Sequence, residues 1–252
     1  MTAAPVHLGG ERVMLDPGGV AMLALRRVMV VSDLHLEKGS HFAQGGRFVP
    51  PYDTRETLTK LAGLVRLYGP KRLVMLGDSF HDAAGPGRMQ PQDKAMLEQI
   101  VSGLEVIWVL GNHDPVPPEG LAGQVVEEWR EGSLVMRHQG GGPGAEISGH
   151  CHPKASLPTR AGPVTRPCFL FDGRRLLMPA FGAYTGGLDV RSPAIATLFP
   201  RGGRAFLLGK ERLYSGQTGP LRAPAVKPEM ALPPLTVEGG TVAKMRQGPT
   251  SG

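Results

Sequence analysis

The histidines at positions 150 and 152 lie one residue apart in the stretch SGHCHPKA, directly after a glycine run and a short apolar segment. In extended backbone, alternate side chains point to the same side. Both imidazoles would therefore face one point in space while Cys151 faces away. Two imidazoles on one side are typical of a metal site. A loop with two surface histidines is the alternative for this pair taken alone.

Polar residues of the same types follow four other strand-length apolar runs, often beside a glycine. In a parallel sheet the carboxyl ends of the strands line up along one edge, where ligands bind. Coincidence is a poor explanation for five such motifs in one chain. In chain order they are Asp33 with His35, Asp78, Asn112 with His113 and Asp114, His138, and His150 with His152.

These residue types suit the hydrolysis of a phosphodiester, whose oxygens repel anionic nucleophiles. Two divalent ions about 3.5–4 Å apart hold a hydroxide between them and neutralise the phosphoryl oxygens. One carboxylate must then span both ions, and Asp78 at its tight Gly-Asp turn is placed to do so. The neutral amide of Asn112 keeps the site cationic enough to bind phosphate. His113 is free to face the substrate and protonate the leaving oxygen, with Asp114 fixing its tautomer.

The elements that must position these residues form a β-α-β-α-β series in the first half of the chain. Strands are predicted at 27–33, 72–78 and 105–112, and helices at Asp53–Tyr68 and Pro91–Ser102. Asp53 and Glu56 resemble a capping box at the start of the first helix. From Gln124 onward only strands are predicted, at 124–129, 133–138, 145–149, 167–171, 175–178, 194–199 and 204–208. This order predicts two packed sheets with helices outside.

The composition is that of a soluble chain with one substantial domain, since 41% of its 252 residues are hydrophobic and 20% are charged. No apolar run approaches the ~20 residues that a membrane span needs, and the first residues lack the pattern of a signal peptide. Two cysteines give no disulfide framework, which fits a reducing cytosol. The formal charge of +6 is compatible with a polyanionic partner or with a solvated surface. Residues 1–215 are expected to form the domain, and residues 216–252, rich in Pro and Gly, a disordered tail.

The motifs D-x-H, G-D, G-N-H-D, H and G-H-x-H, in this order over residues 28–153, resemble those of the calcineurin-like metallophosphoesterase superfamily. More narrowly, SDLHLEKGSHF, LGDSFHD, VLGNHD and GHCHP are similar to stretches of the bacterial ligase-associated DNA damage response endonuclease family PdeM. The resemblance implies an α/β fold, a four-layer α/β/β/α sandwich of two mixed sheets, with a dinuclear metal site between the sheets.

The resemblance also implies a role for each motif residue. By this resemblance, the first divalent ion is held by Asp33, His35 and His152. The second is held by Asn112, His138 and His150, and the carboxylate of Asp78 bridges both ions. His113 is the implied proton donor or oxyanion stabiliser, and Asp114 its orienting partner. Manganese is the expected ion, although this ligand set suits iron and zinc as well.

The function implied is a dinuclear metal-dependent phosphodiesterase, a cytoplasmic nuclease that acts on DNA in repair, with DNA ligase or helicase as partners and no membrane. A small-molecule phosphatase or nucleotide pyrophosphatase is the alternative, for example the UDP-diacylglucosamine hydrolases, which also begin with D-L-H-L. Their third motif carries Arg where this chain has His113, and they usually carry a membrane-associating insertion. A non-catalytic scaffold is a third class, against which the presence of every ligand argues.

Other polar residues near the motifs have two interpretations each. His81 and Asp82 suit either contacts around the metals and phosphate or a plain capping role. Lys38, His41 and Arg47, in the loop after the first motif, suit either a substrate path or a solvated loop.

Overall fold

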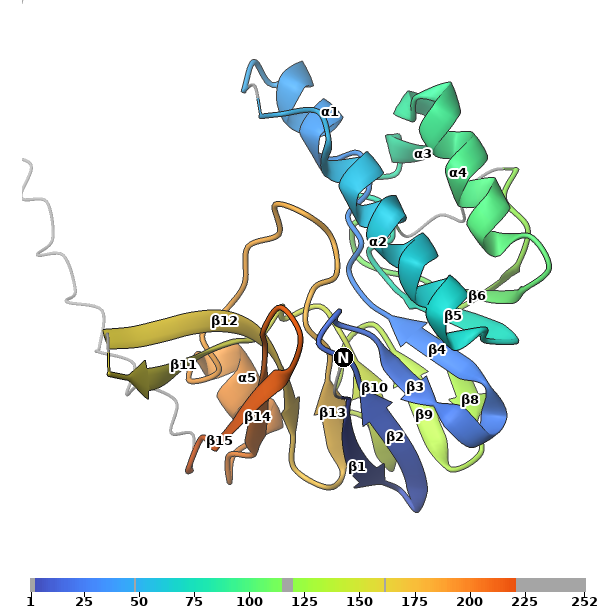
Figure 1. Cartoon of the computed structure of the whole chain (residues 1–252). Helices are drawn as coiled ribbons and strands as arrows, with labels where there is room; N and C mark the ends of the chain where they lie inside the picture. The colour runs from blue at the N-terminus through green and yellow to red at the C-terminus, as the bar shows by residue number, and fades with distance from the viewer. Residues whose placement is uncertain (1–2, 48, 115–119, 161, 221–252) are drawn as a thin grey trace, which may run out of the picture.

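The structure is a computed structural model that describes residues 3–47, 49–114, 120–160 and 162–220 (Figure 1). The first of its two sheets has seven strands in chain order, antiparallel from β1 to β4 and parallel from β4 to β7. Its strands are β1 (Ala4–Leu8), β2 (Glu11–Leu15), β3 (Ala21–Leu23), β4 (Val28–Val31), β5 (Arg72–Leu76), β6 (Glu105–Val109) and β7 (Gln124–Val126).

The second sheet has the strand order β15-β14-β12-β13-β10-β9-β8, and β11 pairs with β12 beside this path. Pairing is parallel among β9, β10 and β13 and antiparallel elsewhere. The strands are β8 (Glu128–Glu131), β9 (Leu134–Arg137), β10 (Ala145–Ser148), β11 (Lys154–Thr159), β12 (Gly162–Phe171), β13 (Arg175–Leu177), β14 (Arg204–Leu208) and β15 (Leu213–Gln217).

The helices pack outside these sheets, and three of them contribute most of the helical side chains that are buried in the core. They are α2 (Asp53–Tyr68) and α4 (Pro91–Val101) on the first sheet and α5 (Pro193–Leu198) on the second. Three further helices connect the strands: η1 (Ala24–Arg26), α1 (Lys38–Gln44) and α3 (Gly85–Arg88).

Alternation along the central strands explains why their sequences are continuously apolar. In β4, Val28 and Val30 pack in the core between the two sheets, whereas Met29 and Val31 pack against α2 and α4. Successive strand side chains point to opposite faces, so a strand covered on both sides needs apolar residues at every position. A third core joins the second sheet to α5. The layers are therefore helices, sheet, sheet and helix, and the predicted four-layer sandwich is confirmed.

Three details of the sequence analysis differ from the structure. The segment 194–199, predicted as a strand, forms α5 instead, with Pro193 in its first turn and Ile195 and Ala196 buried against the second sheet. The capping box at α2 is not formed, because Asp53 accepts a hydrogen bond from the Gly39 N–H at 2.9 Å. Strands β1, β2, β3, β11 and β15 had no counterpart in the predicted elements.

The expected boundary after residue 215 falls inside β15, where Gly216 pairs with Ala205 and Gln217 with Arg204 of β14. The rest of the expected tail, residues 221–252, lies outside the described residues. Among the helices that the structure describes, none has the length and apolar character to cross a bilayer.

The apolar stripe of α2 gives a stability prediction. Leu61 is fully buried against the first sheet, whereas Leu67 on the other side of the same helix is 56% exposed. Leu61→Ala should lower the free energy of unfolding by about 2–5 kcal/mol, and Leu67→Ala by less than about 0.5 kcal/mol. Urea denaturation of both variants checks this. Equal losses would contradict the packing of α2 described here.

Candidate metal centre

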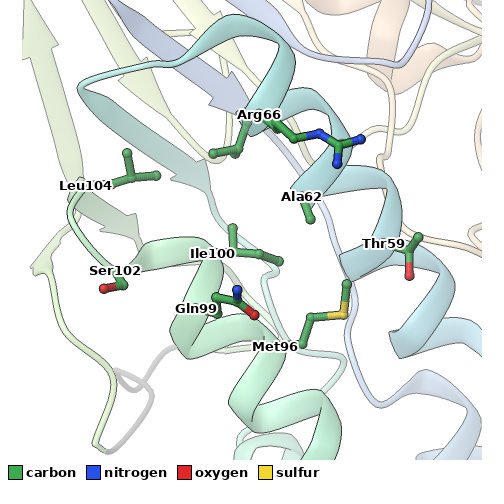
Figure 2. Close-up of a pocket in the computed structure, with 10 residues that line it drawn as sticks. Thr59, Ala62, Arg66, Met96, Gln99, Ile100, Ser102 and Leu104 are labelled. Carbon is green, nitrogen blue, oxygen red and sulfur yellow. The ribbon is translucent and has the colours of Figure 1, made fainter.

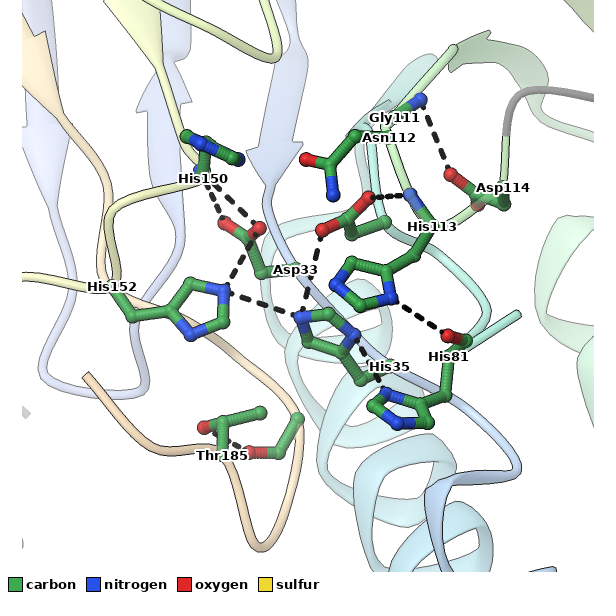
Figure 3. Close-up of polar contacts among 12 residues, drawn as sticks. Asp33, His35, His81, Gly111, Asn112, His113, Asp114, His150, His152 and Thr185 are labelled. Atoms are coloured by element: carbon green, nitrogen blue, oxygen red, sulfur yellow. Dashed lines mark hydrogen bonds and ion pairs between the residues drawn. The ribbon is translucent and has the colours of Figure 1, made fainter. Parts of the chain in front are cut away.

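The seven ligand candidates come from five loops, each directly after a strand. Three loops follow the parallel strands β4, β5 and β6 of the first sheet, and two follow β9 and β10 of the second. The loops of both sheets bring their side chains together at one centre (Figure 3). The positions are Asp33, His35, Asp78, Asn112, His138, His150 and His152.

One group of four side chains gathers around Asp33, which is fully buried. The Asp33 Oδ1 lies 3.1 Å from the His152 Nε2, and the His35 Nε2 lies 3.2 Å from that same nitrogen. Asp78 completes the group, with its Oδ2 3.8 Å from the His35 Nε2. Two carboxylates and two imidazoles with lone pairs aimed at one volume form a candidate cation site.

A second group gathers around His138, which is buried. The His138 Nε2 lies 3.0 Å from the Asn112 Oδ1, 3.2 Å from the His150 Nδ1 and 3.4 Å from the Asp78 Oδ2. The other ring nitrogen, Nδ1, donates to the carbonyl oxygen of Leu76 at 3.0 Å. This hydrogen bond leaves the lone pair of Nε2 toward the group, which is the tautomer that a ligand needs.

The Asp78 carboxylate belongs to both groups. Its Oδ2 faces His35 of the first group and His138 of the second, at 3.8 and 3.4 Å. Its Oδ1 accepts a hydrogen bond from the backbone N–H of His113 at 2.9 Å, which fixes the plane of the carboxylate. One carboxylate oxygen therefore points between the two groups.

The backbone at these ligands is strained rather than extended. Five of the seven ligands are non-glycine residues in the left-handed region, a conformation that costs on the order of 1–3 kcal/mol each and concentrates at functional sites. The φ values are 55° at Asp33, 45° at His35, 48° at Asp78, 70° at His150 and 45° at His152. His150 and His152 reach two adjacent ligand groups from this conformation, not from an extended strand. Cys151 between them packs in the core next to α5.

Glycines in the motifs permit the close approach of the ligands. A Cβ added at Gly149 would lie 2.6 Å from the Asp33 Oδ2, and one added at Gly77 would lie 2.6 Å from the His138 Cβ. A Cβ at Gly111 would lie 2.6 Å from the Asp114 Oδ1. Each distance is shorter than real carbon contacts allow, so these three positions have no room for a side chain.

The protonation states of His35 and Asp78 suit cation binding. Burial lowers the pKa of His35 to about 3, which keeps the imidazole neutral. Burial alone would raise the pKa of Asp78, but in the metal-free protein the hydrogen bond and charge of a protonated His138 outweigh it and lower the pKa to about 2. The same pairing raises the pKa of His138 against the effect of its burial, so His138 must release a proton when its Nε2 binds a metal ion. A neutral imidazole and an ionised carboxylate are the forms that coordinate a metal ion.

His113 belongs to neither of the two groups that contain Asp78, although one ring nitrogen each of His113, His35 and His81 lie within 4.8 Å of one another. Its ring contacts that of His35 edge-on, with centroids 5.1 Å apart, and stacks on His81 at 5.2 Å. Its Nδ1 donates to the His81 carbonyl oxygen at 2.9 Å, so its Nε2 is the nitrogen left for a substrate. The side chain is exposed, which gives a substrate access to it.

Asp114 does not orient the His113 ring, contrary to the expectation from the sequence. Its buried carboxylate accepts backbone N–H groups of Ser79 at 2.7 Å, Phe80 at 3.1 Å and Gly111 at 3.2 Å. These bonds tie the loop after β5, which carries Asp78, to the loop after β6, which carries Asn112 and His113. Asp114 is therefore a positioning residue, and the His81 carbonyl holds the His113 ring.

Three of the neighbouring residues with two interpretations have clear contacts in the structure. Asp82 has a structural role, since its carboxylate accepts the Ala84 N–H at 2.9 Å and pairs with Arg88 at 2.6 Å. His41 also contacts Asp82, at 2.6 Å. The His81 Nδ1 lies 3.4 Å from the His35 Nδ1, so His81 is close enough to orient that ligand. Sequence reasoning had no means to find this contact, because the two residues are 46 positions apart.

Hollows on the surface differ in what they offer to a substrate. One hollow between α2 and α4 (Figure 2) is lined by Ala62, Ile100, Leu104 and other residues, none of them Asp, Glu, His or Cys. It therefore offers no carboxylate, imidazole or thiolate to a metal ion. Another hollow is lined by Asn112 and His138 together with Arg137 and opens directly at the second ligand group.

Comparisons with known proteins agree with this geometry. A family model of the calcineurin-like phosphoesterases matches residues 26–155, which is 130 of the 252 residues and includes all seven ligand candidates. A search of curated proteins found no match. Among solved structures, the crystal structure of Pseudomonas putida nuclease MPE is similar, with 28% sequence identity and a TM-score of 0.65, and the match covers 84% of this chain and 100% of that one.

The close approach at Gly149 gives a prediction on metal affinity. Gly149→Ala places a methyl group against the Asp33 carboxylate and the Ser32 hydroxyl. Metal affinity should fall by at least the ~10–100-fold that loss of an outer contact causes. Gly63→Ala is the matched control, because nothing lies within 4 Å of that added methyl group in α2. Isothermal titration with Mn²⁺ checks this, and unchanged affinity in Gly149→Ala would refute the described contact.

Proposed function

Because the chain belongs to the calcineurin-like phosphoesterase family, whose members hydrolyse phosphoester bonds with divalent metal ions, we propose that it is a nuclease with two metal ions in its active site. The first ion is assigned to Asp33, His35 and His152, and the second to Asn112, His138 and His150. Asp78 is the bridge between them. Each assignment follows the grouping of side chains described above.

The two-metal proposal depends on one observation: the Asp78 Oδ2 lies between His35 and His138. The two ligand groups share no other side chain. When bound, two ions at such a site activate a water molecule and neutralise phosphoryl oxygens. The chain's own contribution is a set of ligands whose protonation, tautomer and backbone are fixed before a substrate arrives.

His113 is the proposed proton donor to the leaving oxygen. Its Nδ1–H is engaged by the His81 carbonyl, so the protonated ring presents Nε2–H to the substrate. Its contact with His35 places this group beside the first set of ligands. Asp114 supports the reaction from a distance by holding the two loops that carry Asp78 and His113.

A polymeric substrate fits the accessibility of the centre. Asn112, His113 and His150 are exposed on the open side of a centre whose carboxylates are buried. A nucleic acid strand can therefore reach the ligands without entering a closed cavity. The similarity to a nuclease and the formal charge of +6 also favour a polyanion.

The finer parts of the proposal follow the resemblance to the PdeM endonucleases. We infer DNA as the polymer, repair as the process, DNA ligase or helicase as partners and the cytoplasm as the compartment. The two cysteines are free and buried, which is compatible with a reducing compartment. Manganese is the ion that we would test first, with iron and zinc compatible with the same ligands.

The bridging role of Asp78 predicts its effect on metal content. The protein as prepared with excess Mn²⁺ should hold two ions per chain, and Asp78→Ala should lose most of both. Its nuclease activity should fall by more than the ~10–100-fold typical of outer-contact losses. Asp82→Ala is a suitable control, because Asp82 lies in neither ligand group. Elemental analysis that finds one ion in the wild type rules out the two-metal proposal.

The proposed role of His113 predicts a dependence on the leaving group. A DNA oxygen leaves as a poor, strongly basic alkoxide, whereas nitrophenolate needs no proton. His113→Ala should therefore keep both ions and lose about 10²–10⁴-fold on DNA, with a smaller loss on a nitrophenyl phosphodiester. Steady-state rates on both substrates measure this difference. Equal losses of rate on the two substrates would indicate that His113 stabilises the charge of the phosphoryl group instead. Loss of metal in the variant would show that His113 is a ligand.

A further inference from the structure

A short arch of residues 183–187 lies against the first ligand group and has no part in the chemistry described so far. At one end, the Gly182 N–H donates to the carbonyl oxygen of Asp33 at 3.1 Å. At the other end, the Leu188 N–H donates to the carbonyl oxygen of His152 at 3.2 Å. Both ends of the arch are thus hydrogen-bonded to residues that carry metal ligands. In the view of Figure 3, Thr185 of this arch lies below His152.

Tyr184 within this arch is unusual in two respects. Its φ of 58° is in the left-handed region, which is a genuine outlier for a bulky side chain. Its side chain is also 45% exposed, and among the described residues it has no hydrogen-bond, aromatic or cation partner. The fold therefore holds an exposed, unpartnered aromatic residue on a strained backbone, within an arch whose two ends are hydrogen-bonded to Asp33 and His152. Strain of this kind points to function rather than stability.

Lys154 lies next to the arch and two residues after His152. A Cβ added at Gly187 would lie 2.9 Å from the Lys154 Cε, so the aliphatic part of the lysine packs on the arch. Within the described ranges, no carboxylate forms an ion pair with Lys154. From here β11 and β12 project as a hairpin beyond the body of the molecule (Figure 1). Residues 154–171 contain Lys154, Arg160 and Arg166 and no acidic residue.

We propose that Tyr184 stacks on the nucleobase next to the scissile phosphate and that Lys154 contacts a phosphate of the same strand. Stacking on an exposed aromatic ring accepts any base, because every base has a π-face. The strand then leaves the metal centre over the arch, toward the β11–β12 hairpin. This inference rests on the proposed nuclease function and adds a subsite for the flanking nucleotide to it.

Two chromogenic diesters with the same leaving group test the role of Tyr184: thymidine 5′-(p-nitrophenyl phosphate) and methyl p-nitrophenyl phosphate. Tyr184→Gly in the metal-loaded protein should lower kcat/KM for the thymidine diester by about 5- to 100-fold, and leave the methyl diester unchanged. Tyr184→Phe should retain the wild-type ratio of kcat/KM for the thymidine diester to kcat/KM for the methyl diester. Because glycine accepts a positive φ without strain, the Tm of Tyr184→Gly should stay the same or rise. Tyr214→Ala, at a similarly exposed tyrosine of β15, is the matched control.

Parallel losses on both diesters with a lowered Tm would show that Tyr184 only holds the arch, and would overturn the proposal. An unchanged ratio in Tyr184→Gly would overturn it as well. Failure of the nuclease function is a separate result, seen when the wild type hydrolyses both diesters and leaves oligothymidylate intact.

The role of Lys154 is tested by the salt dependence of binding. For Lys154→Ala, the slope of log KM for oligothymidylate against log salt concentration should fall by about 0.7. Arg130→Ala on the distant strand β8 should leave that slope unchanged.

Discussion

The constraint on which the rest of the structure depends is one buried carboxylate that must face two sets of ligands at once. Asp78 is 2% exposed, and its Oδ2 lies between His35 from the first sheet and His138 from the second. This position is possible only if the carboxyl ends of both sheets meet. The core between the sheets provides that alignment, since residues such as Val74, Met136 and Phe169 pack there from both sides. A shift of one sheet against the other would separate His138 from Asp78.

Rigidity at the centre comes from contacts that leave no spare room. Gly77, Gly111 and Gly149 bring neighbouring loops closer than any side chain would allow. The five ligand residues with left-handed backbone conformations are strained, and the surrounding packing must offset the free-energy cost of that strain. Asp114 adds three hydrogen bonds to backbone amides across two loops. The ligand positions are thus over-determined by the fold, which is the usual requirement for a preorganised metal site.

Periodicity and residue type were sufficient to predict the layers of the fold, and the predicted ligand candidates lie together in the structure. The apolar runs before Asp33, Asp78 and Asn112 are buried on both faces, and helix α2 has the predicted bounds Asp53–Tyr68. The superfamily resemblance is confirmed by the family match, and the similarity to a nuclease supports the narrower one. Local sequence patterns gave wrong predictions where contacts between distant parts of the chain determine the structure. The segment 194–199 is helical because of its packing, and the His81 carbonyl takes the place expected of Asp114 through a contact across loops.

Asp78 is proposed to bridge two metal ions, and the electron paramagnetic resonance spectrum of the Mn²⁺-loaded protein is the most direct test of this role. Ions joined through one bridging carboxylate, about 3.5–4 Å apart, have coupled spins. The account predicts a coupled dinuclear spectrum at two equivalents of Mn²⁺, and its loss in Asp78→Ala. A spectrum of isolated Mn²⁺ ions at full loading would contradict it.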